Sequence, residues 1–195
     1  MSRIVWKALF WAILAIPGLA MIWQFSHNDM LAMDMLHPSG EMSIRLMILA
    51  MLAGPLSEFF GLNRFFRAWL AIRRNLGVAA FGYAILHLAF YFLDMPDVAA
   101  VLDELGIAGI WTGWLALALM IPPASISFDK AMRRLGRKWK MIQRLVYAAL
   151  IISLVHWLLL DWDWWPAFIH LAPLMIAWGL RWSSARRKAS LLRSI

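Results

Sequence analysis

Residues 76–93 read LGVAAFGYAILHLAFYFL, a run without a single Asp, Glu, Lys or Arg that carries one histidine, His87. A helix needs about 20 mostly apolar residues to cross a bilayer, and this run predicts such a helix. Five further segments are also long and mostly apolar: 5–25, 42–58, 107–127, 144–160 and 166–182. We therefore expect an all-α integral membrane bundle of six transmembrane helices, which forms a single domain over residues 1–195.

The composition of the whole chain supports a membrane protein. Of the 195 residues, 63% are hydrophobic, whereas soluble domains are about half apolar. The formal charge of +8 would suggest nucleic-acid binding in a soluble chain, but in so apolar a chain it reports membrane topology instead. We expect the lipid bilayer, and no nucleic acid, as a partner. Cysteine is absent, which excludes disulfides, thiolate metal sites and a cysteine nucleophile.

The charged residues divide between the two ends of the predicted helices. Every Lys and Arg except Arg45 lies at the start of the first segment, between the second and third, between the fourth and fifth, or at and after the end of the sixth. The loops on the opposite side contain no Lys or Arg. Their acidic residues are Asp29, Asp34, Asp94, Asp97, Asp103, Glu104, Asp161 and Asp163. Because basic loops stay inside, both termini of this multi-pass membrane protein are expected to be cytoplasmic.

Three of the five histidines fall within predicted helices, namely His87, His156 and His170. With a rise of about 1.5 Å per residue, all three lie in one layer, about 6–9 Å below the outer end of the hydrocarbon. The other two, His27 and His37, fall in the predicted outer loop 26–41, where solvated side chains are the plain expectation.

An imidazole within a membrane is costly and is by default a functional candidate. A single one can simply hydrogen-bond between helices, for example to Ser153, Tyr83 or a backbone carbonyl. Two at matched depth on different helices favour ligation, because two neutral imidazoles can bind the opposite axial faces of a haem iron whose porphyrin fills an apolar slot. A zinc or iron site without porphyrin would need a third ligand, and the nearby acids lie only at helix ends.

Arg45 is the one basic residue away from the cytoplasmic loops, in the first turn of the second predicted helix. An Arg fork pairs well with the carboxylates of haem propionates. Snorkelling to the outer headgroups, or pairing with Glu41 four residues earlier, would account for it equally well.

Four stretches of the chain resemble the MsrQ (YedZ) family of haem-binding membrane subunits, which belongs to the ferric-reductase-like transmembrane group. They are LHPSGEMSIRLMILAMLAGPL (36–56), RRNLGVAAFGYAILHL (73–88), AMRRLGRKWKMIQRLVY (131–147) and SLVHW (153–157). The third is the most specific, because its LG-x-x-W-x6-VY pattern is followed by a histidine nine residues after the tyrosine. The resemblance covers nearly the whole chain, from about residue 8 to residue 182.

The resemblance implies at least one haem b with His87 and His156 as its iron ligands. It also implies a cofactor or propionate role for Arg45 and a functional role for His37, and we keep His170 as an alternative ligand or a packing residue. Electrons would pass from a cytoplasmic flavin reductase or the quinone pool to a periplasmic molybdopterin reductase that repairs oxidised methionine.

The chain departs from its relatives at Gln143, where they usually carry a second histidine linked to an inner cofactor. Gln143 lies about 20 Å towards the cytoplasm from the outer histidine layer. Because glutamine is a poor haem ligand, a second haem is in doubt, and FMN or a quinone would have to shorten the gap.

Three functions remain open. The first is an electron-transfer subunit with no catalytic residues of its own, because the chain has no G-x-G-x-x-G fingerprint and no room for a nucleotide-binding domain. The second is a haem protein that reduces another periplasmic acceptor, such as ferric iron. The third is a haem-free scaffold or small transporter, although the absence of any Asp or Glu in mid-helix counts against transport.

Overall fold

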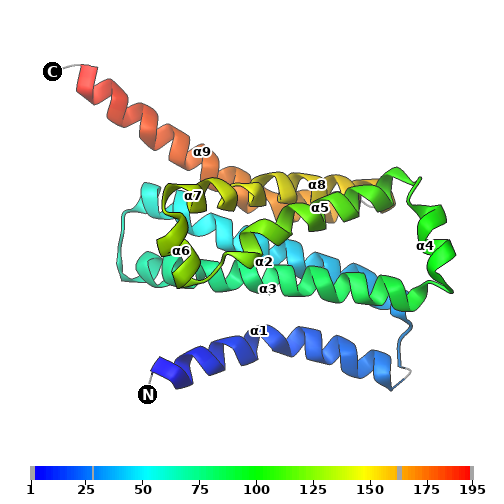
Figure 1. Cartoon of the computed structure of the whole chain (residues 1–195). Helices are drawn as coiled ribbons and strands as arrows, with labels where there is room; N and C mark the ends of the chain where they lie inside the picture. Colours follow the sequence, from blue (N-terminus) through cyan, green and yellow to red (C-terminus); the bar gives the residue numbers. More distant parts are fainter. Residues whose placement is uncertain (1–2, 28, 162–163, 194–195) are drawn as a thin grey trace.

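The computed structural model describes residues 3–27, 29–161 and 164–193, and in these residues all regular structure is helical (Figure 1). The prediction of an all-α fold is therefore confirmed for the described part of the chain. Two residues assigned from the sequence to an outer loop, Asp163 and its neighbour Trp162, lie outside the described residues.

Each of the six predicted segments corresponds to one long helix, and only 107–127 and 144–160 extend beyond their helices, by one or two residues. The long helices are α1 (Arg3–Ser26), α2 (Ala32–Phe60), α3 (Arg64–Asp94), α5 (Ala108–Ser125), α8 (Leu145–Leu160) and α9 (Trp165–Arg193). Short helices occupy the connections: α4 (Val98–Glu104), α6 (Asp129–Leu135) and α7 (Arg137–Gln143). The basic and acidic connections between the predicted segments are thus largely helical too.

Five helical segments of the described chain are long and apolar enough to cross a membrane: Val5–Ser26, Ala32–Phe60, Arg64–Asp94, Ala108–Ser125 and Arg137–Leu160. The predicted sixth segment, 166–182, lies in α9, which is not among them. Its histidine, prolines, tryptophans and Arg181 lower its mean hydropathy. The sixth span consequently remains a prediction.

The start of α2 differs from the expectation of a loop over 26–41. The helix already begins at Ala32, and the Asp34 carboxylate accepts a hydrogen bond of 2.9 Å from the Leu31 backbone N–H, which satisfies an amide at the helix start. Pro38 is accommodated inside this first part of the helix. The loop expectation for residues 32–41 was wrong, and His37 lies on the first part of this helix, where its side chain stays exposed.

α2 occupies the centre of the bundle, where it packs against α3 and α9, and α5 packs against α8. The buried side chains form one cluster that includes Met47, Leu52 and Leu150. Ala53, Ala80, Ala149 and Ala177 are completely buried where helices meet. Small residues at these positions let the helix backbones approach closely, which is how helices associate in membranes.

α1 lies at the outside of the bundle (Figure 1), and Tyr83 of α3 fastens it there. The Tyr83 hydroxyl donates to the Leu14 carbonyl and accepts from the Gly18 N–H, both at 2.8 Å. These two backbone groups would bond to each other in an uninterrupted helix. The hydroxyl is therefore inserted into the hydrogen-bond ladder of α1, beside Pro17.

α9 follows α2 and then leaves the other helices, so that its C-terminal part projects from the bundle (Figure 1). Arg181 Nε, near this departure, donates to Glu58 Oε2 of α2 at 2.6 Å. At the same end of the bundle, Arg74 of α3 donates to Asp129 of α6 at 2.6 Å. These ion pairs join α3 to α6 and α2 to α9.

Candidate cofactor site

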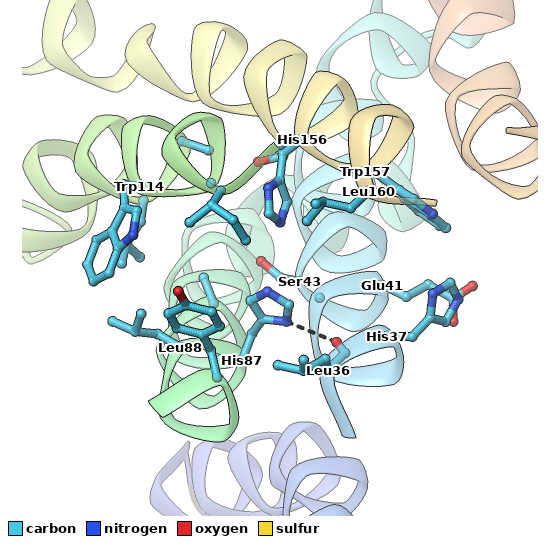
Figure 2. A pocket seen from close by; sticks show the side chains of 18 of the residues that line it. Leu36, His37, Glu41, Ser43, His87, Leu88, Trp114, His156, Trp157 and Leu160 are labelled. Atoms are coloured by element: carbon cyan, nitrogen blue, oxygen red, sulfur yellow. Dashed lines mark hydrogen bonds between the residues drawn. The ribbon is translucent and has the colours of Figure 1, made fainter. Parts of the chain in front are cut away.

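His87 of α3 and His156 of α8 face each other (Figure 2). Their ring centroids are 6.0 Å apart and their planes are perpendicular, at 89°. Two metal–nitrogen bonds of about 2.0 Å, with about 1 Å from each nitrogen to its ring centre, would place two imidazoles on one metal about 6 Å apart. The separation of the two rings thus suits a single bridging ion.

The hydrogen bonds of both rings leave the same nitrogen free. His87 Nδ1 lies 2.9 Å from the Leu36 carbonyl oxygen, and His156 Nδ1 lies 2.6 Å from the Gly109 carbonyl oxygen. A carbonyl only accepts, so each Nδ1 carries the proton and each Nε2 keeps its lone pair. Among the described residues, neither Nε2 has a hydrogen-bond partner. This tautomer, fixed by a carbonyl, is typical of metal-binding histidine.

A cavity of about 460 Å³ lies between α2, α3, α5 and α8 and includes both rings in its lining. Its volume falls in the range of ligand pockets, about 300–1,000 Å³. Most of the wall is apolar, with Leu36, Ile44, Leu88, Trp114, Leu117 and Met120 among its residues. A flat apolar group held by the two imidazoles would be shielded from water on these sides.

The rim of the cavity is acidic, at the end of the bundle where α3 and α8 terminate. Asp94, Glu104 and Asp161 line it there, and Tyr91 donates a hydrogen bond of 2.8 Å to Glu104. None of the described residues that line the cavity is a lysine or an arginine. Carboxylates on a bound cofactor would therefore find no basic partner in the wall itself.

Arg45 does not line the cavity, although its neighbour Glu41 does. Arg45 Nη2 donates to Glu41 Oε1 at 2.7 Å, the i−4 pairing that the sequence left as the alternative. Its Nε donates to His170 Nε2 at 2.9 Å. Arg45 and His170 are thus connected to the cavity through Glu41 and do not contact it directly.

The two ring nitrogens of His170 are both engaged. Nδ1 donates to the Pro166 carbonyl at 2.6 Å, which leaves Nε2 to accept from Arg45. Glu41 Oε1 lies 3.1 Å from the same Nε2. The ring also packs against Trp157, with centroids 5.6 Å apart.

His37 does line the cavity, at its outer edge (Figure 2). Its ring meets Trp157 edge to face at 5.4 Å, and its Nδ1 lies 3.6 Å from Asp161 Oδ2. The side chain remains 55% exposed, so it joins the site from the surface. The structure thus brings His37, His87 and His156 together at one cavity.

Sequence reasoning missed the polar residues of the rim. Glu41 was considered only as a partner for Arg45, Glu104 appeared only among the acids of the outer loops, and Tyr91 was not considered. Tyr91 follows His87 by one helical turn, a spacing that places it on the same face and that was available as a signal.

Gln143, the last residue of α7, lies just before α8 and faces no cavity lined by histidine. Its amide donates to the Pro123 carbonyl at 3.0 Å and to Ser127 Oγ at 3.3 Å, which satisfies polar groups at the C-terminal end of α5. Within the described ranges, no group of three or more His, Asp or Glu side chains is placed to hold a metal ion.

The structure is a helical membrane bundle in which imidazoles from two different helices face each other. Sequence comparison identifies the group of membrane proteins to which the chain belongs. Residues 39–154 match the family described as ferric reductase like transmembrane component; this match contains His87 and ends two residues before His156. The chain is accordingly a multi-pass helical membrane protein of that group.

Within this group, the chain belongs to the MsrQ family, as the sequence motifs suggested. The protein-methionine-sulfoxide reductase heme-binding subunit MsrQ of Brucella anthropi is 28% identical over 201 aligned positions, which cover 96% of this chain and 88% of the relative. The subunits of the same name from Brucella ovis and Brucella suis are 33% identical over 153 positions, which cover 77% of this chain and 67% of each relative.

Proposed function

We propose that the chain is a haem b membrane subunit that passes electrons across the inner membrane to a periplasmic molybdenum-dependent methionine sulfoxide reductase. The observation that carries the proposal is the pair of facing imidazoles, 6.0 Å apart, with both Nε2 lone pairs free. The names of the Brucella relatives, heme-binding subunits of a protein-methionine-sulfoxide reductase, support a haem and a methionine sulfoxide reductase system.

The residues around the cavity fit a haem. His87 and His156 would hold the iron from two helices, and the apolar wall would enclose the porphyrin. The bound haem would supply one-electron chemistry. The protein's part is to fix the ring orientation through the carbonyls of Leu36 and Gly109, and to exclude water from the metal.

The charge pattern supports a topology with six spans and both termini in the cytoplasm. This places the cavity near the periplasmic surface, where a periplasmic partner can reach it. Because the chain contains no cysteine, single cysteines can report the topology directly. A membrane-impermeant maleimide is expected to label Asp103→Cys in intact spheroplasts and Arg137→Cys only after lysis; the reverse pattern would contradict the topology.

The electron donor lies on the other side of the membrane in this proposal, as a cytoplasmic flavin reductase or the quinone pool. With Gln143 at the end of α7, the segment that leads into α8 has no imidazole at a level about 20 Å from the outer histidines. FMN or a quinone bound near this end would shorten the electron's path. Reduction of the haem in inverted membrane vesicles by NADH with added flavin reductase, or by a quinol, distinguishes the two donors.

The haem itself is tested by absorption spectroscopy of membranes that contain the protein. Dithionite reduction is expected to give a b-type spectrum, and His87→Ala and His156→Ala should each abolish it. His27→Ala is the matched control, because His27 stacks on Trp23 within α1 and its neighbouring turn, away from the cavity. If both ligand variants keep the full spectrum, the assignment is wrong; if the wild type has none, the haem-free scaffold replaces it.

A second acceptor is favoured by one observation, the acidic rim formed by Asp94, Glu104 and Asp161. Carboxylates attract cations, so ferric iron could take electrons at the same outer edge. Membranes that reduce ferric iron only when the wild-type protein is present, without a periplasmic subunit, would favour this function. Reduction that requires the molybdenum-dependent subunit would favour the first.

A further inference from the structure

α2 presents three groups to His87 from successive positions on one face. The Leu36 carbonyl accepts from His87 Nδ1 at 2.9 Å. The Ser39 hydroxyl, which is fully buried, donates to the carbonyls of Met35 at 2.6 Å and Leu36 at 3.0 Å. Gly40 leaves room for the ring, because a Cβ at this position would lie 3.1 Å from His87 Nδ1.

α5 presents a carbonyl, a hydroxyl and a glycine to His156 at the same spacing. One contact differs: Ser39 Oγ also lies 3.4 Å from His87 Nδ1, whereas the hydrogen bonds of the described residues include none between Thr112 and His156. The Gly109 carbonyl accepts from His156 Nδ1 at 2.6 Å. The buried Thr112 hydroxyl donates to the carbonyls of Ala108 at 2.8 Å and Gly109 at 2.7 Å. A Cβ at Gly113 would lie only 2.7 Å from His156 Cε1, a distance that atoms do not adopt.

The two arrangements agree position by position. The stretches LHPSG (36–40) and GIWTG (109–113) each place a carbonyl at the first position, a hydroxyl at the fourth and a glycine at the fifth. Positions i, i+3 and i+4 share one face of a helix. Each histidine comes from the helix that packs beside this face, α3 beside α2 and α8 beside α5.

We propose that these residues form twin cradles, Leu36–Ser39–Gly40 and Gly109–Thr112–Gly113, which position the two haem ligands and tune them alike. The proposal rests on the proposed function, because it assigns the positioning of ligands that bind the haem. The glycine lets the ring lie against the helix backbone, and the carbonyl fixes the tautomer. The glycines of α5 therefore position His156, in addition to letting α5 and α8 pack closely.

In both cradles, the hydroxyl has a role that differs from those of the carbonyl and the glycine. A carbonyl that already accepts from Ser39 or Thr112 shares its electron density between two donors. Loss of the hydroxyl leaves the whole acceptor capacity to the imidazole N–H, which makes Nε2 a stronger donor to the metal. A stronger donor favours the ferric state, so the reduction potential should fall by a similar amount in the two variants.

The experiment compares Ser39→Ala and Thr112→Val in the detergent-purified, haem-loaded full chain. Matched controls are Ser57→Ala on α2 and Ser125→Ala on α5, because these hydroxyls make the same i−3 backbone bond away from the cavity. We expect lower midpoint potentials and shifted electron paramagnetic resonance g-values in both cradle variants, and unchanged values in both controls. The proposal is overturned if either cradle variant behaves like its control.

A second measurement uses the haem-free chain labelled with ¹⁵N-histidine. In the wild type, both His87 and His156 are expected as the Nδ1–H tautomer. Gly113→Ala should remove this preference at His156 alone, whereas Gly54→Ala, where a Cβ meets nothing within 4 Å, should change neither ring. An unchanged His156 in Gly113→Ala would overturn the cradle.

These readouts separate the two proposals. A wild type that shows the tautomers but binds no haem would refute the proposed function and leave the cradles standing as a positioning device. A wild type that binds haem, with cradle variants that match their controls, would refute the cradles alone. Where the haem is bound, Gly113→Ala should weaken it by about 10- to 100-fold, as removal of outer-shell support does at metal sites.

Discussion

The two ends of α5 receive similar contacts from the chain beside it, with different results. At one end, His156 of α8 donates to the Gly109 carbonyl of α5; at the other, Gln143, the last residue of α7, donates to the Pro123 carbonyl of α5. The imidazole keeps a second nitrogen with a free lone pair at a cavity. The amide N–H groups of Gln143 are used by Pro123 and Ser127. Similar helix packing thus leaves a free ring nitrogen at the histidine end and none at the glutamine end, and the proposed haem site depends on that nitrogen.

The largest effect should come from making the histidine end resemble the glutamine end. His156→Gln can still donate to the Gly109 carbonyl, but it has no second nitrogen for a metal. We expect complete loss of the b-type spectrum, with the protein still helical and extractable, measured by reduced-minus-oxidised absorption and circular dichroism. A spectrum of normal height would show that the free lone pair is not what binds the haem.

The reciprocal change, Gln143→His, should not create a second haem site. All five histidines of the chain lie elsewhere, and the structure places none opposite position 143. The haem-to-protein ratio should equal that of the wild type in pyridine haemochrome assays. A doubled ratio would show that the glutamine end holds a latent site.

A modest effect is expected for Gln143→Leu, because this change removes the side-chain amide. The Pro123 carbonyl then keeps one donor, the Ser127 hydroxyl at 2.7 Å. Loss of one such hydrogen bond costs about 0.5–1.5 kcal/mol. Thermal unfolding in detergent should show a modest loss of stability with the haem spectrum unchanged. Loss of haem in this variant would mean that the two ends are coupled.

The smallest effect concerns the ion pair that joins α3 to α6 at the glutamine end. The hydrogen bond and charge of Arg74 hold the pKa of Asp129 below its ordinary value of 3.8. A lowered pKa means that the pair stabilises the fold above pH 3.8, and that this stability is lost as the pH falls through the lowered value. The pair is exposed, so the gain is slight.

Asp129→Asn should therefore unfold slightly earlier than the wild type at neutral pH, with the difference closing in acid. The measurement is thermal unfolding in detergent at a series of pH values. A difference that widens in acid would contradict the sign. Asp97→Asn, on the opposite end of the bundle, serves as a control for loss of one surface carboxylate.

The sequence predicted the helices well because apolar runs are local and long. The segment 144–160 differs from α8 by one residue at its start. The start of α2 was missed because the Asp34 cap and an early Pro38 are weak local signals, and the polar residues of 26–41 resemble a loop. Parts of the acidic and basic loops also form short helices, which are too short to show a periodic pattern of hydrophobic residues.

The histidine pair was predictable from depth, because position along a helix fixes height in the membrane. Rotation about the helix axis is not fixed in this way, which is why His170 shares the layer of His87 and His156 yet points to Arg45 and Pro166. The cradles were hidden for a related reason. The spacing in LHPSG and GIWTG is visible in the sequence, but only the fold shows that an imidazole lies against each.

The attachment of α1 through Tyr83 has a consequence for how this helix can move. The hydroxyl bonds to both members of one i, i+4 pair of α1 and belongs to α3. If the two helices separate, the Gly18 amide and the Leu14 carbonyl can pair with each other, but the Tyr83 hydroxyl loses both partners. Within hydrocarbon no water can replace them, and an unpaired polar group costs several kcal/mol. Although most of its surface faces outward, α1 is therefore held at one height against α3, because sliding would take the hydroxyl away from both backbone groups.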